Sequence, residues 1–280
     1  MFTLSAFADE IAPDPQTQID VLQSCGVRHI EFRSILGINV LALTDLQIKE
    51  FKALLDKNGV RLSAIGSPIG KVRIDEPFGP HLEKLGRAIE LCKVFGTPNI
   101  RIFSYYPPEG LKWDDCGDFR REVLDRMWQK CRLAQKAGVR LLHENEHLIY
   151  GDSPERVTDL MTTVLNQANM PLAAVYDAAN YVYGGYDAWD GWQKTKEWTR
   201  HLHIKDWVAG QTHGSIPGEG QGQLPRVIAD AVRSGYDGFA TMEPHLLGGG
   251  PTGGQTGPDL FPKAVAAFKK IVEAAGGKYQ

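Results

Sequence analysis

The sequence lacks both a long apolar run and a dense basic segment. No stretch of the chain approaches the roughly 18 apolar residues that a membrane-spanning helix needs. The first residues reach Asp9 and Glu10 before a signal-peptide core could form. Lys and Arg number 31 against 34 Asp and Glu, which gives a formal net charge of −3. We therefore expect a cytoplasmic protein whose main partner is neither a membrane nor a nucleic acid.

Cysteine is also scarce. The four cysteines form no C-x-x-C pair, so nothing indicates a zinc knuckle or a redox dithiol; they are Cys25, Cys92, Cys116 and Cys131. This usage is typical of a reducing compartment. Apolar residues make up 42% and charged residues 23% of the 280 positions, as in globular proteins. No linker divides the chain, so we expect one domain over residues 1–280, and the sequence leaves a homo-oligomer open.

A repeated unit runs along the sequence. Five glycines each stand between an apparent helix and a β-rich apolar run: Gly26, Gly59, Gly96, Gly138 and Gly235. This position, just after the end of a helix, favours a residue that can adopt the left-handed conformation. The pattern predicts eight strands, near residues 3–8, 29–33, 61–66, 99–104, 139–144, 172–177, 201–206 and 239–243. A helix is expected after each strand, the last over about residues 259–274.

Strict alternation of strands and helices indicates a parallel sheet, because parallel neighbours need a crossover connection. Eight units in 280 residues are about 35 residues each, which matches a (β/α)8 barrel. An open doubly wound sheet usually has a Gly-rich turn after its first strand, and FADEIAP has none. The predicted fold class is therefore a single (β/α)8 TIM barrel. The Gly-rich segment 248–257, between the last strand and the last helix, is expected to be a flexible surface loop, with a flap or phosphate-binding loop as the alternative.

Four consecutive predicted strands end in a carboxylate or an imidazole. These residues are Glu144, Asp177, His203 and Glu243. One such residue alone is usually a helix cap or an ion-pair partner, but the strand ends of a barrel converge on one mouth. Buried charges are costly unless they are paired or bind a metal. Three carboxylates with one imidazole suit a single divalent ion, Mn²⁺ or Mg²⁺ before Zn²⁺ or Co²⁺.

Further polar and aromatic residues follow the same strands. Glu146, Lys205 and His245 share strand parity with the proposed ligands, so we expect them to contact substrate hydroxyls, with salt bridges to the loops as the alternative. His201 is expected to be a hydrogen-bonded core residue. Aromatic residues near the strand ends could stack on a sugar or simply pack at the barrel rim; they are Phe7, Tyr105, Tyr106, Trp113 and Trp207.

The motifs LLHENE, VYDAAN, HLHIKDW followed by PGEGQG, and TMEPHL together resemble the xylose isomerase-like barrel superfamily, which includes sugar phosphate isomerases/epimerases and ketose 3-epimerases. The resemblance implies that Glu144 and Glu243 are both metal ligands and the acid/base pair, with Asp177 and His203 as ligands only. Two positions depart from the ketose epimerases. Asn180 stands where those enzymes usually carry His, and the Arg that often follows the strand-7 His has no clear match, a contact that Lys205 could supply. The endonuclease IV branch carries many more His ligands than this chain offers.

The resemblance implies a metal-dependent isomerase or epimerase of a sugar or sugar derivative, acting by proton abstraction through a metal-stabilised enediolate. A lyase or dehydratase acting on a keto-sugar or polyol needs the same metal and base, so the sequence leaves it open. A non-catalytic binding protein on the same barrel is a third hypothesis. In each case the expected partner is a small-molecule carbohydrate.

Overall fold

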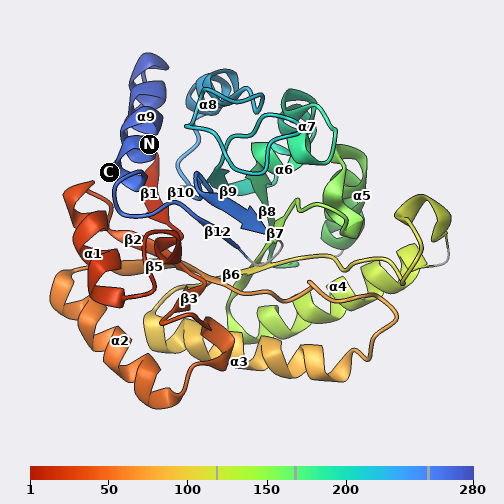
Figure 1. The fold of residues 1–280 in the computed structure, drawn as a ribbon. Coiled ribbons are helices and arrows are strands. Elements are labelled where there is room, and N and C mark those ends of the chain that lie inside the picture. The colour runs from red at the N-terminus through yellow and green to blue at the C-terminus, as the bar shows by residue number, and fades with distance from the viewer. Residues whose placement is uncertain (118, 167–168, 251–252) are drawn as a thin grey trace.

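Eight parallel strands close into a barrel in the order β1-β10-β9-β8-β7-β6-β5-β2 (Figure 1). The computed structural model describes residues 1–117, 119–166, 169–250 and 253–280. The barrel strands are β1 (Thr3–Ala6), β2 (His29–Phe32), β5 (Arg61–Gly66), β6 (Asn99–Ile102), β7 (Arg140–Glu144), β8 (Leu172–Asp177), β9 (Thr199–Ile204) and β10 (Phe239–Met242). The predicted (β/α)8 barrel is confirmed.

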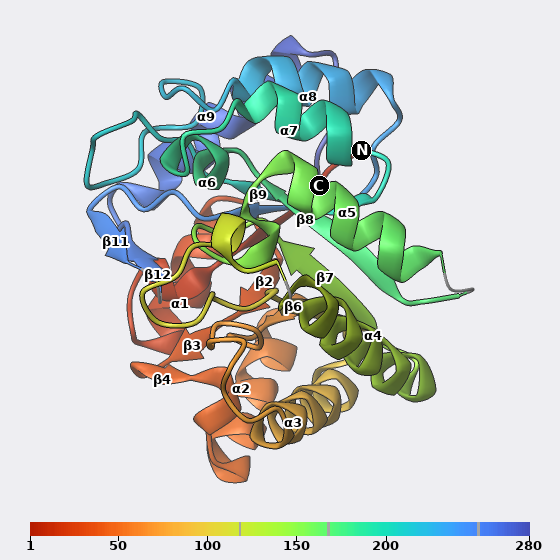
Figure 2. The ribbon, with the colours of Figure 1, turned by 90° about the vertical axis from the view of Figure 1, so that its right-hand side faces the viewer.

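Helices surround the barrel, and at least one follows each of its strands before the next barrel strand begins (Figures 1 and 2). They are α1 (Pro15–Ser24), α2 (Asp45–Asn58), α3 (Gly79–Phe95), α4 (Phe119–Ala137), α5 (Pro154–Leu165), α6 (Ala178–Tyr183), α7 (Ala188–Thr195), α8 (Leu224–Arg233) and α9 (Phe261–Ala274). Short 3-10 helices are η1 (Ala8–Glu10), η2 (Val40–Ala42), η3 (Trp113–Asp115) and η4 (Tyr150–Asp152). Among the described residues, no helix has the length and apolar character that crossing a bilayer requires.

Local sequence signals set the helix ends. Asp14 caps α1 by accepting a hydrogen bond from the Thr17 amide at 2.8 Å, and Ser153 caps α5 in the same way. The five glycines of the repeat all have φ between 65° and 72°, the left-handed region that closes a helix; they are Gly26, Gly59, Gly96, Gly138 and Gly235. The repeat seen in the sequence is therefore a repeat of helix ends.

The apolar core has two parts. The larger part lies between the strands and the helices. A small separate cluster contains Ala64, Leu142, Ala173 and Val175. Leu142 lies two residues before Glu144 on β7, so both side chains face the barrel interior. The barrel interior is thus apolar around this small cluster and polar at the carboxyl ends of the strands. These carboxyl ends form the mouth of the barrel.

Two regions differ from the expectation. The predicted strand 201–206 lies at residues 199–204, so Lys205 and Asp206 belong to the loop after β9. The Gly-rich segment, expected to be a surface loop, instead contains an antiparallel hairpin of β11 (Gly248–Gly250) and β12 (Gly253–Gln255) at the mouth (Figures 1 and 2). A second hairpin, β3 (Ser34–Ile35) with β4 (Ile38–Asn39), follows β2. Residues 251–252 of the Gly-rich segment lie outside the described residues.

Candidate metal centre

The four residues predicted as ligands meet at the barrel mouth. Glu144 ends β7, Asp177 ends β8, His203 lies on β9, and Glu243 directly follows β10. One potential ligand atom from each lies within 4.8 Å of all the others, and every one of the four side chains is buried. Asp177 and His203 are partners in the β8–β9 register, which fixes their proximity through the backbone. We call this group the quartet.

The imidazole of His203 faces the three carboxylates. Its Nδ1 lies 3.2 Å from Glu144 Oε1, 3.3 Å from Glu243 Oε2 and 3.9 Å from Asp177 Oδ2. This buried nitrogen has no hydrogen-bond partner in the described part of the chain. A cation placed among these atoms would satisfy a buried group that is otherwise costly to leave unpaired. The donors, mostly oxygens with one nitrogen, therefore fit a divalent ion.

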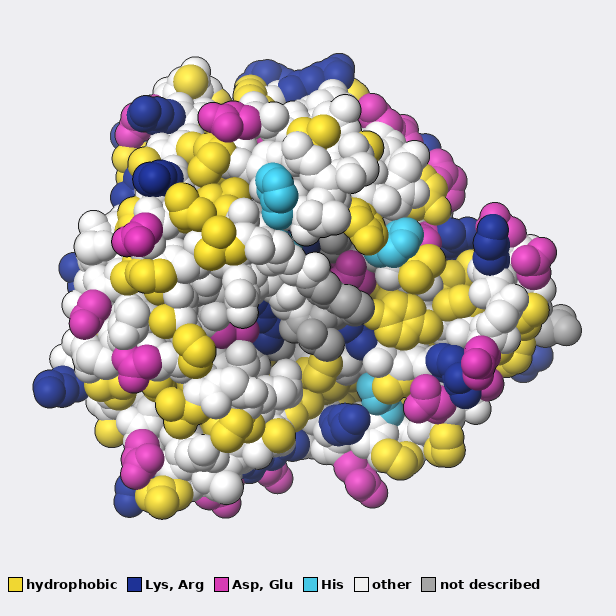
Figure 3. All heavy atoms as spheres, in the orientation of Figure 1, with side chains coloured by type: hydrophobic (Ala, Val, Ile, Leu, Met, Phe, Trp, Pro, Cys, Tyr) yellow, Lys and Arg dark blue, Asp and Glu magenta, His cyan; other side chains and the backbone are white. Residues whose placement is uncertain are grey.

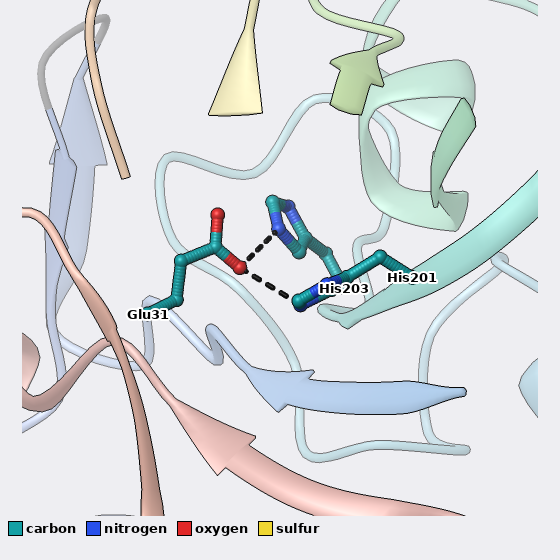
Figure 4. A group of neighbouring side chains, drawn as sticks. All are labelled: Glu31, His201 and His203. Atoms are coloured by element: carbon teal, nitrogen blue, oxygen red, sulfur yellow. Dashed lines mark hydrogen bonds and ion pairs between the residues drawn. The ribbon is translucent and has the colours of Figure 1, made fainter. Parts of the chain in front are cut away.

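A buried carboxylate holds the other side of the same imidazole (Figure 4). Glu31 Oε2 lies 3.1 Å from Nε2 of His203 and 2.9 Å from Nε2 of His201. Because Nε2 of His203 is occupied in this way, Nδ1 is the nitrogen left for a metal. Ligand histidines commonly use their second nitrogen for such an orienting bond. His201 is buried and also contacts Thr241, in agreement with the expected core role.

Three buried cations surround the quartet, each beside one of its carboxylates. The nitrogen–oxygen distances are 3.2 Å for Arg101 to Glu144, 3.0 Å for Arg33 to Glu243, and 2.7 Å for Lys205 to Asp177. Lys205 Nζ also lies 3.4 Å from Glu243 Oε2. Each pairing offsets part of the cost of burying a carboxylate. Every carboxylate of the quartet therefore has a buried cation beside it.

This network separates the pKa values of the carboxyl groups. Burial would raise the pKa of Glu144, but His203 and Arg101 outweigh it and lower that pKa to about 2. Burial likewise opposes ionisation of Glu243, yet Lys205 and His203 hold its pKa well below the usual range. For Asp177 burial dominates, and its pKa rises to about 7. At neutral pH the two glutamates are ionised, as a general base requires.

The three residues predicted to contact substrate, Glu146, Lys205 and His245, all line one cavity of about 640 Å³ above the quartet. Figure 3 looks onto this mouth, where a hollow contains Lys and Arg side chains and is bordered on one side by hydrophobic ones. Glu146 forms an ion pair with Lys71 at 2.7 Å. Lys205, in the loop after β9, points toward the quartet, with its Nζ 2.7 Å from Asp177 Oδ2.

Asn180, the position that departs from the ketose epimerases, braces the quartet. Its side-chain amide donates to Glu144 Oε1 at 3.1 Å and to the Asn145 carbonyl at 2.8 Å. Its backbone amide donates to Asp177 Oδ1 at 2.9 Å, which makes Asp177 the N-cap of α6. Asn180 thus holds two proposed ligands in place.

The paired motif HIKD…PGEG has a structural explanation. The carboxylate of Asp206 accepts hydrogen bonds from the amides of Gly218, Gly220 and Gly222 at 2.8 to 3.0 Å. A Cβ at Gly220 would lie 2.3 Å from Asp206 Oδ1, so no larger residue fits there without rearrangement. Asp206 therefore anchors the loop after β9, next to Lys205.

Glu10 connects the mouth to the Gly-rich hairpin. Its Oε2 accepts from the His245 amide at 2.9 Å and from Thr256 Oγ1 at 2.7 Å. Its Oε1 lies 3.3 Å from His245 Nε2. Burial raises the pKa of Glu10 to about 8, although Arg33 partly opposes this rise.

Several residues of the centre were missed in the sequence. They are Glu10 at the end of η1, Glu31 on β2, Arg33 directly after β2, and Arg101 on β6. Glu31 and Arg33 alternate in IEFR, and Arg101 alternates with apolar residues in NIRIF, so parity alone could have found them. Of the aromatic candidates, Tyr106 and Trp207 line the cavity, whereas Phe7 and Tyr105 are fully buried.

Comparison with known proteins identifies relatives of the whole barrel. The family model for the xylose isomerase-like TIM barrel matches residues 19–271. D-psicose 3-epimerase from Ruminiclostridium cellulolyticum is 25% identical over 248 residues, which cover 80% of each chain.

Two solved structures share the fold. A xylose isomerase-like TIM barrel protein from Mycobacterium smegmatis in complex with magnesium has a TM-score of 0.73 at 18% identity, covering 98% of this chain and 96% of the other. The probable 3-DHS dehydratase AsbF of Bacillus anthracis has a TM-score of 0.71 at 16% identity, covering 96% and 98%. Because the family model matches residues 19–271, the chain belongs to the xylose isomerase-like TIM-barrel family.

Proposed function

We propose that the protein is a divalent-metal-dependent isomerase or epimerase of a sugar or sugar derivative. The observation that carries the proposal is the quartet, in which the Nδ1 atom of His203 faces three carboxylate oxygens at the floor of a cavity. The similarity to a D-psicose 3-epimerase supports a carbohydrate substrate.

In this proposal Glu144, Asp177, His203 and Glu243 hold one divalent ion, Mn²⁺ or Mg²⁺ in preference to Zn²⁺ or Co²⁺. Solved structures of the same fold that contain magnesium or zinc support a divalent ion at this place. The ion would act as a Lewis acid that acidifies the carbon–hydrogen bond beside a substrate carbonyl. Asp177 and His203 serve only as ligands.

Glu144 and Glu243 are the proposed acid and base. One removes the proton from the carbon beside the carbonyl, and the other returns a proton to the substrate. Arg101 and Arg33 lie 3.2 and 3.0 Å from these carboxylates and favour their ionised forms before substrate arrives. Lys205, Glu146 and His245, which line the cavity, are the proposed contacts for substrate oxygens.

A dehydratase reaction is the second candidate. It begins with the same proton abstraction but ends with loss of a hydroxyl. The specific observation in its favour is the ammonium of Lys205, which lines the cavity 3.4 Å from Glu243 Oε2 and could donate a proton to the leaving hydroxyl. The similarity to a probable dehydratase is consistent with it.

The experiment is a substrate screen with the Mn²⁺-loaded protein. A panel of ketoses, keto-sugars and keto-acid sugars is incubated and followed by NMR. A new epimer or isomer, absent with Glu144→Gln or Glu243→Gln, is the expected result, and a dehydrated product would assign the second candidate. A purified chain that neither binds a divalent ion nor converts any member would contradict both and favour a binding protein.

A further inference from the structure

The cavity at the mouth is larger than one sugar ring requires. Its volume is about 640 Å³. At about 30 Å³ per water-sized group it accommodates on the order of twenty non-hydrogen atoms, against about a dozen in a hexose. A substrate that fills this space therefore extends beyond the sugar unit at the quartet.

The walls of the cavity divide by chemistry. The side around the quartet is charged, with Arg33, Arg101, Lys205 and Glu243. Elsewhere polar residues alternate with four large apolar or aromatic ones, here called the apolar wall: Tyr106, Leu148, Tyr183 and Trp207. They come from four segments, following β6, β7, β8 and β9. Four connections of the barrel thus bring apolar groups to one surface.

Two members of the apolar wall lie outside the buried core, whereas Trp207 is part of it. Leu148 and Tyr183 are each 55% exposed, and both line the cavity. Leu148 has a φ of 67°, a left-handed conformation that is uncommon for leucine. Trp113 holds this conformation by donating from Nε1 to the Leu148 carbonyl at 3.0 Å. Clustered exposed apolar side chains and local backbone strain both favour a binding surface.

The aromatic members of the wall support one another. The ring of Tyr183 packs edge-to-face against Trp207 with centroids 5.4 Å apart, and against His147 at 4.9 Å. On the same side of the cavity the carboxylate of Glu146 is engaged by Lys71 at 2.7 Å. The rings of Tyr183 and Trp207 therefore offer an extended substrate an aromatic surface, beside polar lining residues such as Glu146 and Gln211.

We infer, on the basis of the function proposed above, that the substrate is a sugar derivative carrying a planar apolar substituent, such as an aromatic aglycone. The sugar unit lies at the quartet, and the substituent packs against Leu148, Tyr183 and Trp207. Binding of the substituent removes exposed apolar surface on both partners from water, which is favourable.

The test uses matched glycosides and isothermal titration calorimetry with the Mn²⁺-loaded protein. Methyl and phenyl glycosides of glucose and galactose, in both anomeric forms, are compared pairwise. At least one phenyl glycoside should bind about tenfold or more tightly than its methyl partner. Tyr183→Ala and Leu148→Ala, both at exposed positions, should reduce this advantage without weakening methyl glycoside binding. Leu46→Ala, a 65% exposed site on α2, is the control and should leave the advantage intact.

Three results would overturn the inference: no pair in which the phenyl glycoside binds more tightly, an advantage that survives in the Tyr183→Ala/Leu148→Ala double variant, or a disaccharide such as cellobiose that binds as tightly as the phenyl glycoside. Metal content, measured in every sample, separates this inference from the proposed function. A chain that prefers phenyl glycosides without binding metal contradicts only the proposed function, whereas a metal-binding, active chain without the preference contradicts only this inference.

Discussion

Replacing Asp177 with Asn tests the metal centre with little disturbance to the fold. In the wild type, Asp177 Oδ1 accepts a hydrogen bond of 2.9 Å from the Asn180 backbone amide. The asparagine keeps this oxygen, so the cap of α6 persists. The change removes the negative charge that faces His203 Nδ1 at 3.9 Å. It also leaves the Lys205 ammonium, 2.7 Å from Asp177 Oδ2, without its nearest anion. Both effects weaken the binding of a divalent cation at the quartet.

The expected loss of Mn²⁺ affinity is about a hundredfold or more. Removing hydrogen-bond partners of metal ligands already costs 10–100-fold, so loss of a charged ligand should reach at least the upper end. A hundredfold change corresponds to about 2.7 kcal/mol. Isothermal titration calorimetry with Mn²⁺ measures it, and thermal unfolding checks the fold.

Asp187→Asn is the matched control. Asp187 caps α7 by accepting from the Asp190 amide at 2.7 Å and is not part of the quartet, so this variant should bind Mn²⁺ normally. A folded Asp177→Asn protein with wild-type Mn²⁺ affinity would refute the assignment of Asp177 as a ligand.

Three further predictions concern the surrounding structure. Glu31→Leu removes the acceptor for His203 Nε2, so Mn²⁺ affinity measured by calorimetry should fall about 10–100-fold. Glu31→Gln, which keeps an acceptor oxygen, should lose less. If the two variants bind Mn²⁺ equally well, the orienting role of Glu31 is contradicted. Burial lowers the pKa of Lys130 to about 7, whereas an unfolded lysine titrates near 10.4. At a pH between these two values, the unfolded chain therefore binds more protons than the folded chain. In urea denaturation the free energy of unfolding of the wild type should rise with pH relative to Lys130→Met, by up to about 1.4 kcal/mol per unit, and a constant difference would contradict this. Gly220→Ala places a Cβ 2.3 Å from Asp206 Oδ1 and should lower Tm by several degrees, while an unchanged Tm would show that the loop adjusts freely.

The barrel and the quartet were predictable because both follow from local rules. Capping residues and left-handed glycines mark the helix ends, and the alternation of strands and helices implies parallel pairing. Once a barrel is assumed, strand ends converge, so Asp177 on β8 and His203 on β9 must lie near each other.

The layer around the quartet was not predicted, because its contacts join residues far apart in sequence. Glu31 meets His203 across 172 positions and Arg33 meets Glu243 across 210. No local pattern marks such pairs, although strand parity places each side chain inside the barrel. The pairing of β11 with β12 was missed for another reason: glycine has no side chain, so these strands show no alternation.

Solvent deuterium incorporation tests the central claim most directly. The Mn²⁺-loaded protein is incubated in D₂O with the substrate found in the screen, and the carbon beside the carbonyl is followed by NMR. Since Glu144 and Glu243 are proposed to remove and return a proton there, deuterium should appear at that carbon with the wild type. It should not appear with Glu144→Gln or Glu243→Gln at saturating Mn²⁺. An active wild-type enzyme that isomerises or epimerises its substrate without incorporating deuterium at that carbon would contradict the account.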